Sequence, residues 1–203
     1  MKFIRKPKNK ICYQTNEKIW YNFSTKKLNK NKWNFLKKNF IKKDSKSKKY
    51  LFKNRLLVKQ KLKKFYGFIS EYQFKNLFQI TLNKYSKNIT KNFLICLETR
   101  LSTVLFRLNI TNTIFHSIQL INHKKIMVNN KIINSNNYVL KPGDIITILD
   151  YIPKKKKYIY KTPNYLEYNP LLKKAIFIRK PFFNEIKFPF FVNLNLLLEY
   201  YKK

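Results

Sequence analysis

Apolar residues recur at helical spacing through the first half of the chain. Between residues 50 and 85 two such stretches are separated by Gly67, and each has one apolar side. This pattern predicts two amphipathic helices. A third helix is expected from Asn92 to about Leu108, where apolar side chains form one broad stripe. Thr111 or Thr113 can cap a shorter helix that follows.

The period changes from helical to alternating after residue 125. Four short β-strands are predicted at residues 126–128, 131–133, 138–140 and 145–148. Asn129–Asn130 indicates a hairpin turn, because Asn tolerates positive φ better than other non-glycine residues. Pro142–Gly143 fits a type II turn, in which Pro presets φ and Gly supplies the positive φ that follows.

The two ends of the chain differ in pattern. The first 49 residues carry Lys, Asn and scattered aromatic residues without a sustained period, which predicts a basic arm ordered by its partner. The basic run Lys154–Lys157 fits a solvated loop and a phosphate contact equally well. Farther on, residues 176–178 and 188–192 predict strands or turns, and Leu194–Tyr201 a closing helix.

Charge narrows the class of partner. The chain has 45 Lys and Arg against 9 Asp and Glu, a formal net charge of +36. Few partners other than a polyphosphate can balance such a charge, so nucleic acid is the leading partner. Hydrophobic residues make up 44% of the chain, which indicates a folded protein rather than a disordered tail. Lys far outnumbers Arg, and Lys is a flexible point charge, so most of this binding is expected to be independent of sequence.

The same inventory argues against catalysis, metals and membranes. Cys12 and Cys96 lie far apart and form no Cys-x-x-Cys pair, so we expect no zinc site. His116 and His123 have too few acids nearby for a catalytic triad or a metal cluster. No apolar run reaches the roughly 18 residues of a membrane span. We therefore expect no catalytic residue, no cofactor, no metal and no membrane partner.

Residues 98–149 resemble the RNA-binding domain named after small-subunit ribosomal protein 4. The matching residues are Arg100–Leu101, Val104, Arg107–Leu108, Gln119–Leu120–Ile121, His123–Lys124, Ile126–Asn129 and Lys141–Ile146. Flanking segments are similar to that ribosomal protein itself: Lys59–Gly67, Gln73–Phe74, Pro163–Leu166 and Leu197–Tyr201. The resemblance covers residues 50 to 203 in order and is closest to plastid-type members of the family.

What the resemblance implies is an α+β fold with a discontinuous, mostly helical domain. Residues 50–97 would form its first part, and residues 153–203 a basic linker followed by a strand and helix that return to it. The inserted RNA-binding module, residues 98–152, would pack two helices on a small four-stranded sheet. Residues 1–49 remain the basic N-terminal arm.

The resemblance also implies a non-enzymatic constituent of a small ribosomal subunit. Such proteins bind the 5′ domain of the small-subunit rRNA, nucleate assembly, line the mRNA entrance region and contact a neighbouring ribosomal protein. The chain is rich in amino acids that are encoded by AT-rich codons, which is typical of organellar genomes. This composition and the plastid-like C-terminal part favour an organellar ribosome, in a plastid such as an apicoplast, with a mitochondrion as the alternative. An RNA-modifying enzyme and a ribosome-rescue or assembly factor with the same module are the competing functions.

Folded rRNA is recognised largely through its backbone shape, which suits charges at fixed spacing. Arg100 and Arg107 are seven residues apart, so they are predicted to lie on one helix face and fork onto phosphates. A structural ion pair with Glu98 is the alternative for Arg107. Tyr66, beside a lysine cluster, is the best candidate for stacking on an unpaired base. The expected RNA-binding residues are Arg100, Arg107, Gln119, His123, Lys124, Lys125, Asn129, Lys131, Lys59, Lys61, Lys63, Lys64 and Tyr66.

Departures from the family pattern affect the second helix of the module. Ile114 and Ile118 stand where family members commonly carry basic residues, and Ser117 replaces a small Ala. That helix is therefore expected to contact RNA less, or to contact a protein. The four-cysteine zinc knuckle of some relatives is absent from this sequence.

Overall fold

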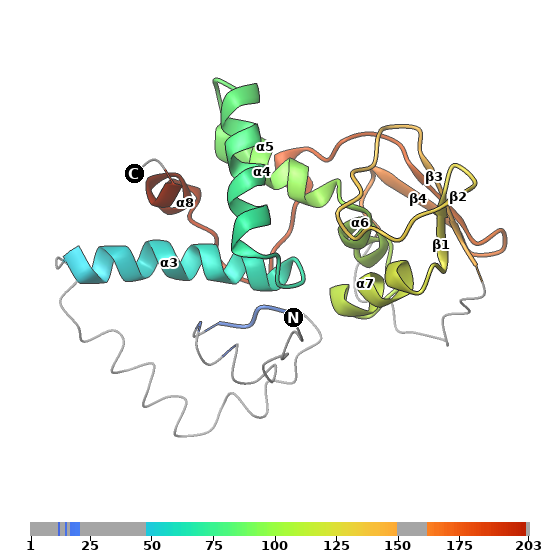
Figure 1. Cartoon of the computed structure of the whole chain (residues 1–203), viewed down its shortest axis with the longest axis horizontal. Coiled ribbons are helices and arrows are strands. Elements are labelled where there is room, and N and C mark those ends of the chain that lie inside the picture. The colour runs from blue at the N-terminus through green and yellow to red at the C-terminus, as the bar shows by residue number, and fades with distance from the viewer. Residues whose placement is uncertain (1–11, 13–14, 16, 21–47, 150–161, 202–203) are drawn as a thin grey trace. The chain divides into compact units, whose positions relative to one another are not determined.

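The computed structural model describes residues 12, 15, 17–20, 48–149 and 162–201 (Figure 1). By its contacts the chain divides into two compact units, one of Met1–Phe65 with Phe188–Lys203 and one of Tyr66–Lys187. The boundaries expected at residues 50, 98 and 153 do not coincide with this division, since residues 66–97 group with the second unit. The expected irregular arm lies mostly outside the described residues, and the Lys154–Lys157 run wholly so.

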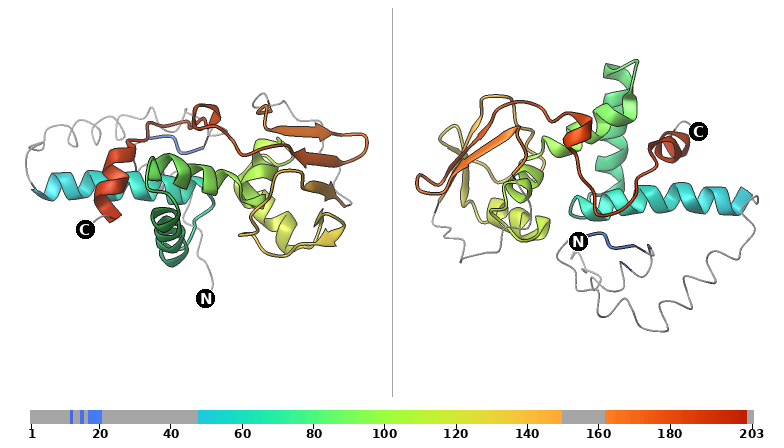
Figure 2. Two further views of the ribbon diagram at one scale, coloured as in Figure 1. Left: turned by 90° about the horizontal axis from the view of Figure 1, so that it is seen from above. Right: turned by 180° about the vertical axis from the view of Figure 1, so that it is seen from behind.

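In the first unit, helix α3 (Lys48–Phe65) packs against α8 (Leu194–Tyr201) (Figure 1, Figure 2). Val58, Leu62 and Phe65 follow helical spacing and are buried. Polar contacts between the helices add to this packing: Arg55 Nη2 lies 2.7 Å from Glu199 Oε2. The closing helix occupies the predicted residues, and it packs on a helix far away in the sequence.

The second unit begins with the helix pair α4 (Glu71–Lys84) and α5 (Ile89–Glu98). Ser70 caps α4, because its Oγ accepts a hydrogen bond from the Gln73 N–H at 3.2 Å. Phe74 and Phe78 of α4 each meet the Phe93 ring edge-to-face, with centroids 5.0 and 5.2 Å apart. The two predicted helices before residue 85 are thus present, and Gly67 separates them with a φ of +86°.

The predicted single helix from Asn92 to Leu108 is wrong, because the chain breaks into α5 and α6 (Leu101–Arg107). Arg100 has an extended backbone, with φ −73° and ψ 137°. The main chain pairs there with a distant loop: Leu101 N–H donates to the Tyr138 carbonyl, and Leu140 N–H to the Thr99 carbonyl, both at 2.9 Å. Hydrogen bonds to the loop thus replace the helical ones. The next helix, α7 (Ile114–Asn122), has the predicted cap, because Thr113 accepts from the His116 N–H.

The α+β class is confirmed, but the sheet has five strands rather than four. They are β1 (Ile126–Val128), β2 (Lys131–Ile132), β3 (Ile145–Ile148), β4 (Leu166–Asn169) and β5 (Lys174–Phe177). All neighbours pair antiparallel, in the order β2-β1-β3-β5-β4. Residues 138–140 contribute only the isolated bridge between Arg100 and Val139, and residues 188–192 contain no strand. Both turn predictions are confirmed by positive φ at Asn129, Asn130 and Gly143.

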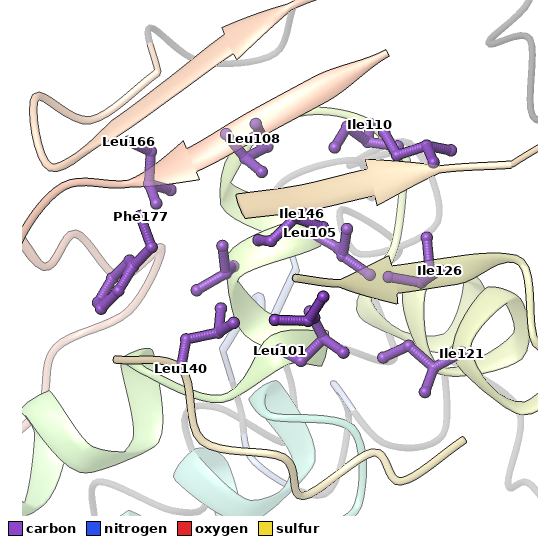
Figure 3. Close-up of a cluster of buried hydrophobic side chains, with 14 of the residues drawn as sticks. Leu101, Leu105, Leu108, Ile110, Ile121, Ile126, Leu140, Ile146, Leu166 and Phe177 are labelled. Carbon is purple, nitrogen blue, oxygen red and sulfur yellow. The ribbon is translucent and has the colours of Figure 1, made fainter. Parts of the chain in front are cut away.

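One face of this sheet packs on α6 and α7 to form the core of the second unit (Figure 3). Leu101 and Leu105 of α6, and Leu108 just after it, lie in one buried cluster with Ile126 and Ile146 of the strands. Burial alternates along β3 and β5, as a sheet with one covered face requires. The core therefore holds α6, α7 and the sheet in fixed positions, and with them the side chains of the predicted RNA-binding module.

Candidate nucleic-acid interface

A buried carboxylate organises the second unit. Glu98 is fully buried, and Arg107 donates to it twice, from Nε to Oε2 at 2.9 Å and from Nη2 to Oε1 at 2.7 Å. The hydroxyl of Tyr66 donates to Oε1 at 2.7 Å, and that of Tyr165 approaches Oε2 at 3.5 Å. Helix α5, helix α6, the turn before α4 and the segment before β4 thus meet at one side chain.

Two predicted RNA-binding residues, Arg107 and Tyr66, are instead bonded to Glu98 in this cluster. Arg107 makes the structural ion pair that was its alternative role, and its side chain is only 9% exposed. Burial, the largest single cause, lowers the pKa of Arg107, but the charge and hydrogen bond of Glu98, together with Tyr66 and Tyr165, raise that pKa overall. The stacking role predicted for Tyr66 is wrong, because its ring is only 1% exposed. Burial first, then the charge of Glu98, raises the pKa of Tyr66, so the phenol stays protonated.

Arg100 is equally buried but incompletely bonded. The residue is 5% exposed, and Nη2 donates to Oδ1 of Asn137, whereas Nε and Nη1 have no hydrogen-bond partner. Burial lowers the pKa of Arg100 to about 10, so the guanidinium remains charged at neutral pH. Because Arg100 precedes α6 instead of lying on it, the predicted shared helix face with Arg107 is wrong.

Four other predicted residues of the module lie between the second half of α7 and the start of β1, and a fifth lies on β2. Gln119, His123 and Lys124 are exposed there and Lys125 is half-buried, while Lys131 is exposed on β2. Cations at the C-terminal end of a helix are favoured by the helix dipole. We call these five residues the α7–β1 corner, the one group of predicted RNA-binding residues that the described structure leaves largely exposed.

Asn129, also predicted to bind RNA, instead holds the hairpin turn. Its Nδ2 donates to Asp144 Oδ1 at 2.9 Å, and its Oδ1 accepts from the Ile145 N–H at 3.0 Å. Both ends of the amide are therefore engaged within the protein. The sequence signal for the turn and the one for RNA binding fell on the same residue, and the structure assigns it to the turn.

The lysine cluster on α3 belongs to the first unit and serves packing there. Lys59 is 6% exposed, and its Nζ donates to the Tyr200 hydroxyl at 2.7 Å and lies 4.1 Å from the centre of that ring. Lys61 Nζ lies 2.8 Å from Glu17 Oε1. Lys63 and Lys64 are half-buried. Lys59 and Lys61 thus make contacts within the fold, and their phosphate contacts stay predictions.

Most acids of the described residues are likewise used by the fold. Glu17, Glu98, Glu185 and Glu199 each pair with a Lys or Arg. Asp144 accepts from the Lys141 N–H at 2.8 Å as well as from Asn129. With these carboxylates engaged internally, the exposed lysines present an excess of positive charge to an anionic partner.

The family departures on α7 have an intramolecular role. A side chain added at Gly67 would place its Cβ 2.6 Å from Cδ1 of Ile118, and Ile114 is also in contact range. Phe115 lies against Phe68, with ring centroids 5.4 Å apart. Apolar side chains on this side of α7 therefore pack on the turn at Gly67. Reduced RNA contact by this helix stays a prediction.

Sequence reasoning missed the central role of Glu98 and the contribution of Tyr165. The available signal was a single Glu at the end of a strongly apolar stretch, Phe93 to Leu97.

Among the described residues, no group of three or more His, Cys, Asp or Glu could hold a metal ion. No helix among them is long and apolar enough to cross a bilayer.

Comparison with known proteins places this geometry in context. Residues 99–146 match the S4 domain, a region that ends within β3 and before β4 and β5. Over 155 residues the chain is 36% identical to small ribosomal subunit protein uS4 of Rickettsia prowazekii (strain Madrid E), covering 73% of this chain and 75% of the relative. The Rickettsia typhi protein (strain ATCC VR-144 / Wilmington) is 36% identical and the Rickettsia canadensis protein (strain McKiel) 34%, with the same coverage.

Proposed function

Because this chain belongs to the family of small ribosomal subunit protein uS4, we propose that it is a structural protein of a small ribosomal subunit and binds that subunit's rRNA. The observation that carries the proposal is the 36% identity over 155 residues, three quarters of the relative. That alignment is far longer than the S4-domain match at residues 99–146. Proteins that share only the RNA-binding module would not produce it, and the relatives are named as ribosomal proteins, not enzymes.

The α7–β1 corner and the charge distribution support this function physically. Lys124 and Lys131 are exposed, and five acids of the described residues are engaged within the fold. A-form RNA offers side chains its phosphates and 2′-hydroxyls rather than its deep groove. A protein with a net charge of +36 releases many counterions on binding such a backbone. Affinity is therefore expected to come mainly from phosphate neutralisation.

We also propose where the chain binds on the ribosome and which compartment holds that ribosome. We place the binding site in the 5′ domain of the rRNA, with a role in nucleating assembly and in lining the mRNA entrance region beside neighbouring ribosomal proteins. The AT-biased, Lys-rich and Asn-rich sequence supports an organellar ribosome. A plastid such as an apicoplast is favoured, and a mitochondrion is the alternative.

Sedimentation tests the structural role directly. Extracts of cells carrying the tagged chain are fractionated at low and at high salt, and the chain and small-subunit rRNA are followed together. A structural protein co-migrates with mature small subunits under both conditions. Release at high salt, or co-migration with immature particles alone, would support the assembly or rescue factor instead. Immunogold labelling of the same cells distinguishes plastid from mitochondrion.

A further inference from the structure

A cavity of about 260 Å³ in the second unit is lined by segments far apart in the sequence. Phe106 lies at the end of α6, Pro163 and Asn164 precede β4, and Asn184 and Lys187 lie in and after the 3₁₀ turn η2 (Phe183–Glu185). The α7–β1 corner contributes none of these lining residues. The cavity is therefore a site separate from the surface already described.

The ionic groups in its wall are already neutralised. Arg107 is held by Glu98, as described above. Glu185 accepts two bonds from Arg179, at 2.9 Å to Oε2 and 2.6 Å to Oε1, and the bond from Arg179 holds the pKa of Glu185 below its usual range. Lys187, which is exposed, is the remaining charged residue of the lining. The wall thus combines apolar surface and amides with one cation.

Two asparagines, Asn164 and Asn184, also line this cavity. Both are exposed, and the structure gives neither side chain a hydrogen bond to another described residue. An asparagine amide offers a donor and an acceptor side by side, which is the pattern that pairs with the edge of a nucleobase. Phe106, which is buried, and Pro163, which is half-buried, supply apolar surface for a base ring, and Lys187 supplies a cation for the phosphate of the same nucleotide.

Size limits what can enter. Pockets for drug-sized ligands span roughly 300 to 1,000 Å³, so 260 Å³ suits one small ring system. A double helix cannot enter such a hollow, whereas an unstacked base from a loop or bulge can. We propose that this cavity receives a single unpaired nucleotide of the rRNA, with its base edge on Asn164 and Asn184 and its phosphate at Lys187. This inference rests on the proposed rRNA binding.

The test compares two double variants of the chain. Asn164→Ala/Asn184→Ala removes both amides from the cavity, and Asn83→Ala/Asn134→Ala removes two exposed amides elsewhere in the second unit. Each protein is bound to the transcribed cognate small-subunit rRNA, and its affinity and nucleotide-resolution chemical footprint are measured. The cavity variant is expected to bind about tenfold more weakly, the loss of one base-edge contact, and to lose protection of one unpaired nucleotide. The control variant should match the wild type.

Identical footprints for the cavity variant and the wild type would overturn the inference while leaving rRNA binding intact. A wild-type chain that protects no part of the rRNA would refute the proposed function itself. A direct probe separates base from phosphate: AMP, GMP, CMP and UMP are titrated against the labelled protein. Shifts of the Asn164 and Asn184 side-chain amide resonances with a nucleotide, and none with inorganic phosphate, support the inference. Equal shifts with phosphate alone would contradict it.

Discussion

Arg107 and Arg100 lie seven residues apart and are similarly buried, yet their surroundings differ completely. Arg107 is bonded twice to a carboxylate that also receives two tyrosine hydroxyls. Arg100 has one amide oxygen for a cation with five N–H donors, and its Nε and Nη1 have no partner. A buried charge stabilises a fold only when its bonding is complete. Arg107 is thus accounted for by folding, whereas two donors of Arg100 are buried without an acceptor.

Removing the carboxylate should have the largest effect, because it makes Arg107 resemble Arg100. Glu98→Gln leaves the Arg107 guanidinium buried without a counter-charge. The free energy of unfolding should fall by about 3–5 kcal/mol, measured by urea denaturation. The matched control is Glu199→Gln, whose side chain is 48% exposed and whose pair with Arg55 should contribute less than about 1 kcal/mol. Equal losses in the two variants would show that Glu98 has no special role.

Removing Arg100 should act in the opposite direction on stability. Arg100→Met replaces an incompletely bonded buried charge by an apolar side chain, so the free energy of unfolding should rise by about 1–3 kcal/mol at neutral pH. Affinity for rRNA should fall in the same protein. The parallel variant Arg107→Met should lose stability, because it leaves Glu98 buried without its cation.

The pH dependence of that gain follows from the pKa of Arg100. Its folded-state value of about 10 lies below the usual 12.5, so the unfolded chain holds the proton more tightly. As the pH rises through 10, the folded arginine loses its proton and its burial costs less. The stability advantage of Arg100→Met should therefore be full below pH 10 and shrink above it. An advantage independent of pH would point to packing instead of charge.

The tyrosines of the cluster should have smaller effects that follow their distances. Tyr66→Phe removes a buried hydrogen bond of 2.7 Å to a carboxylate and should cost about 1–3 kcal/mol in thermal or urea unfolding. Tyr165→Phe removes a contact of 3.5 Å and should cost less. The reverse order would mean that the bonding around Arg107 depends on the segment before β4 more than on the turn before α4.

The smallest effect on stability, with a measurable one on binding, is expected at the surface. Lys124→Gln/Lys131→Gln should leave the urea midpoint unchanged, because both side chains are exposed. Each lost phosphate contact should reduce the slope of log K against log salt by roughly 0.7–0.9. The control Lys124→Arg/Lys131→Arg keeps both charges and should keep the slope. An unchanged slope in the Gln variant would remove the α7–β1 corner from the RNA interface.

Local signals in the sequence predicted the elements that depend on neighbouring residues. The Thr113 cap, the turn at Asn129–Asn130 and the helix Leu194–Tyr201 are all set by residues within a few positions of one another. The break at Arg100 could not be foreseen in this way, because it depends on main-chain pairing with Tyr138 and Val139. Strand β4 was not predicted, and β5, which overlaps the strand or turn predicted at residues 176–178, was not expected in this sheet, because it pairs with β3 across a long connection.

In the candidate site, too, features set by neighbouring residues were predictable, and features set by distant parts of the chain were not. Lys124 follows the end of a helix and Lys131 follows a turn, and both lysines are exposed. The hydrophobic pattern of the sequence predicts both positions directly. The separate fates of Arg100 and Arg107 depend on which acceptors the fold brings to each guanidinium, and spacing along one helix says nothing of that. The role of Tyr66 was predicted wrongly, because a tyrosine next to lysines gives the same sequence pattern whether its ring faces solvent or its hydroxyl bonds a buried residue such as Glu98.

The pairing of α3 with α8 has a consequence for synthesis. Residues 66–187 are continuous, so that unit can fold as soon as it has left the translating ribosome. The first unit cannot, because Val58, Leu62 and Phe65 wait for residues 188–201, which are synthesised more than a hundred positions later. Until then the apolar side of α3 is exposed on the nascent chain, where chaperones can bind it. Vectorial synthesis thus makes the unit that begins first the one that is finished last.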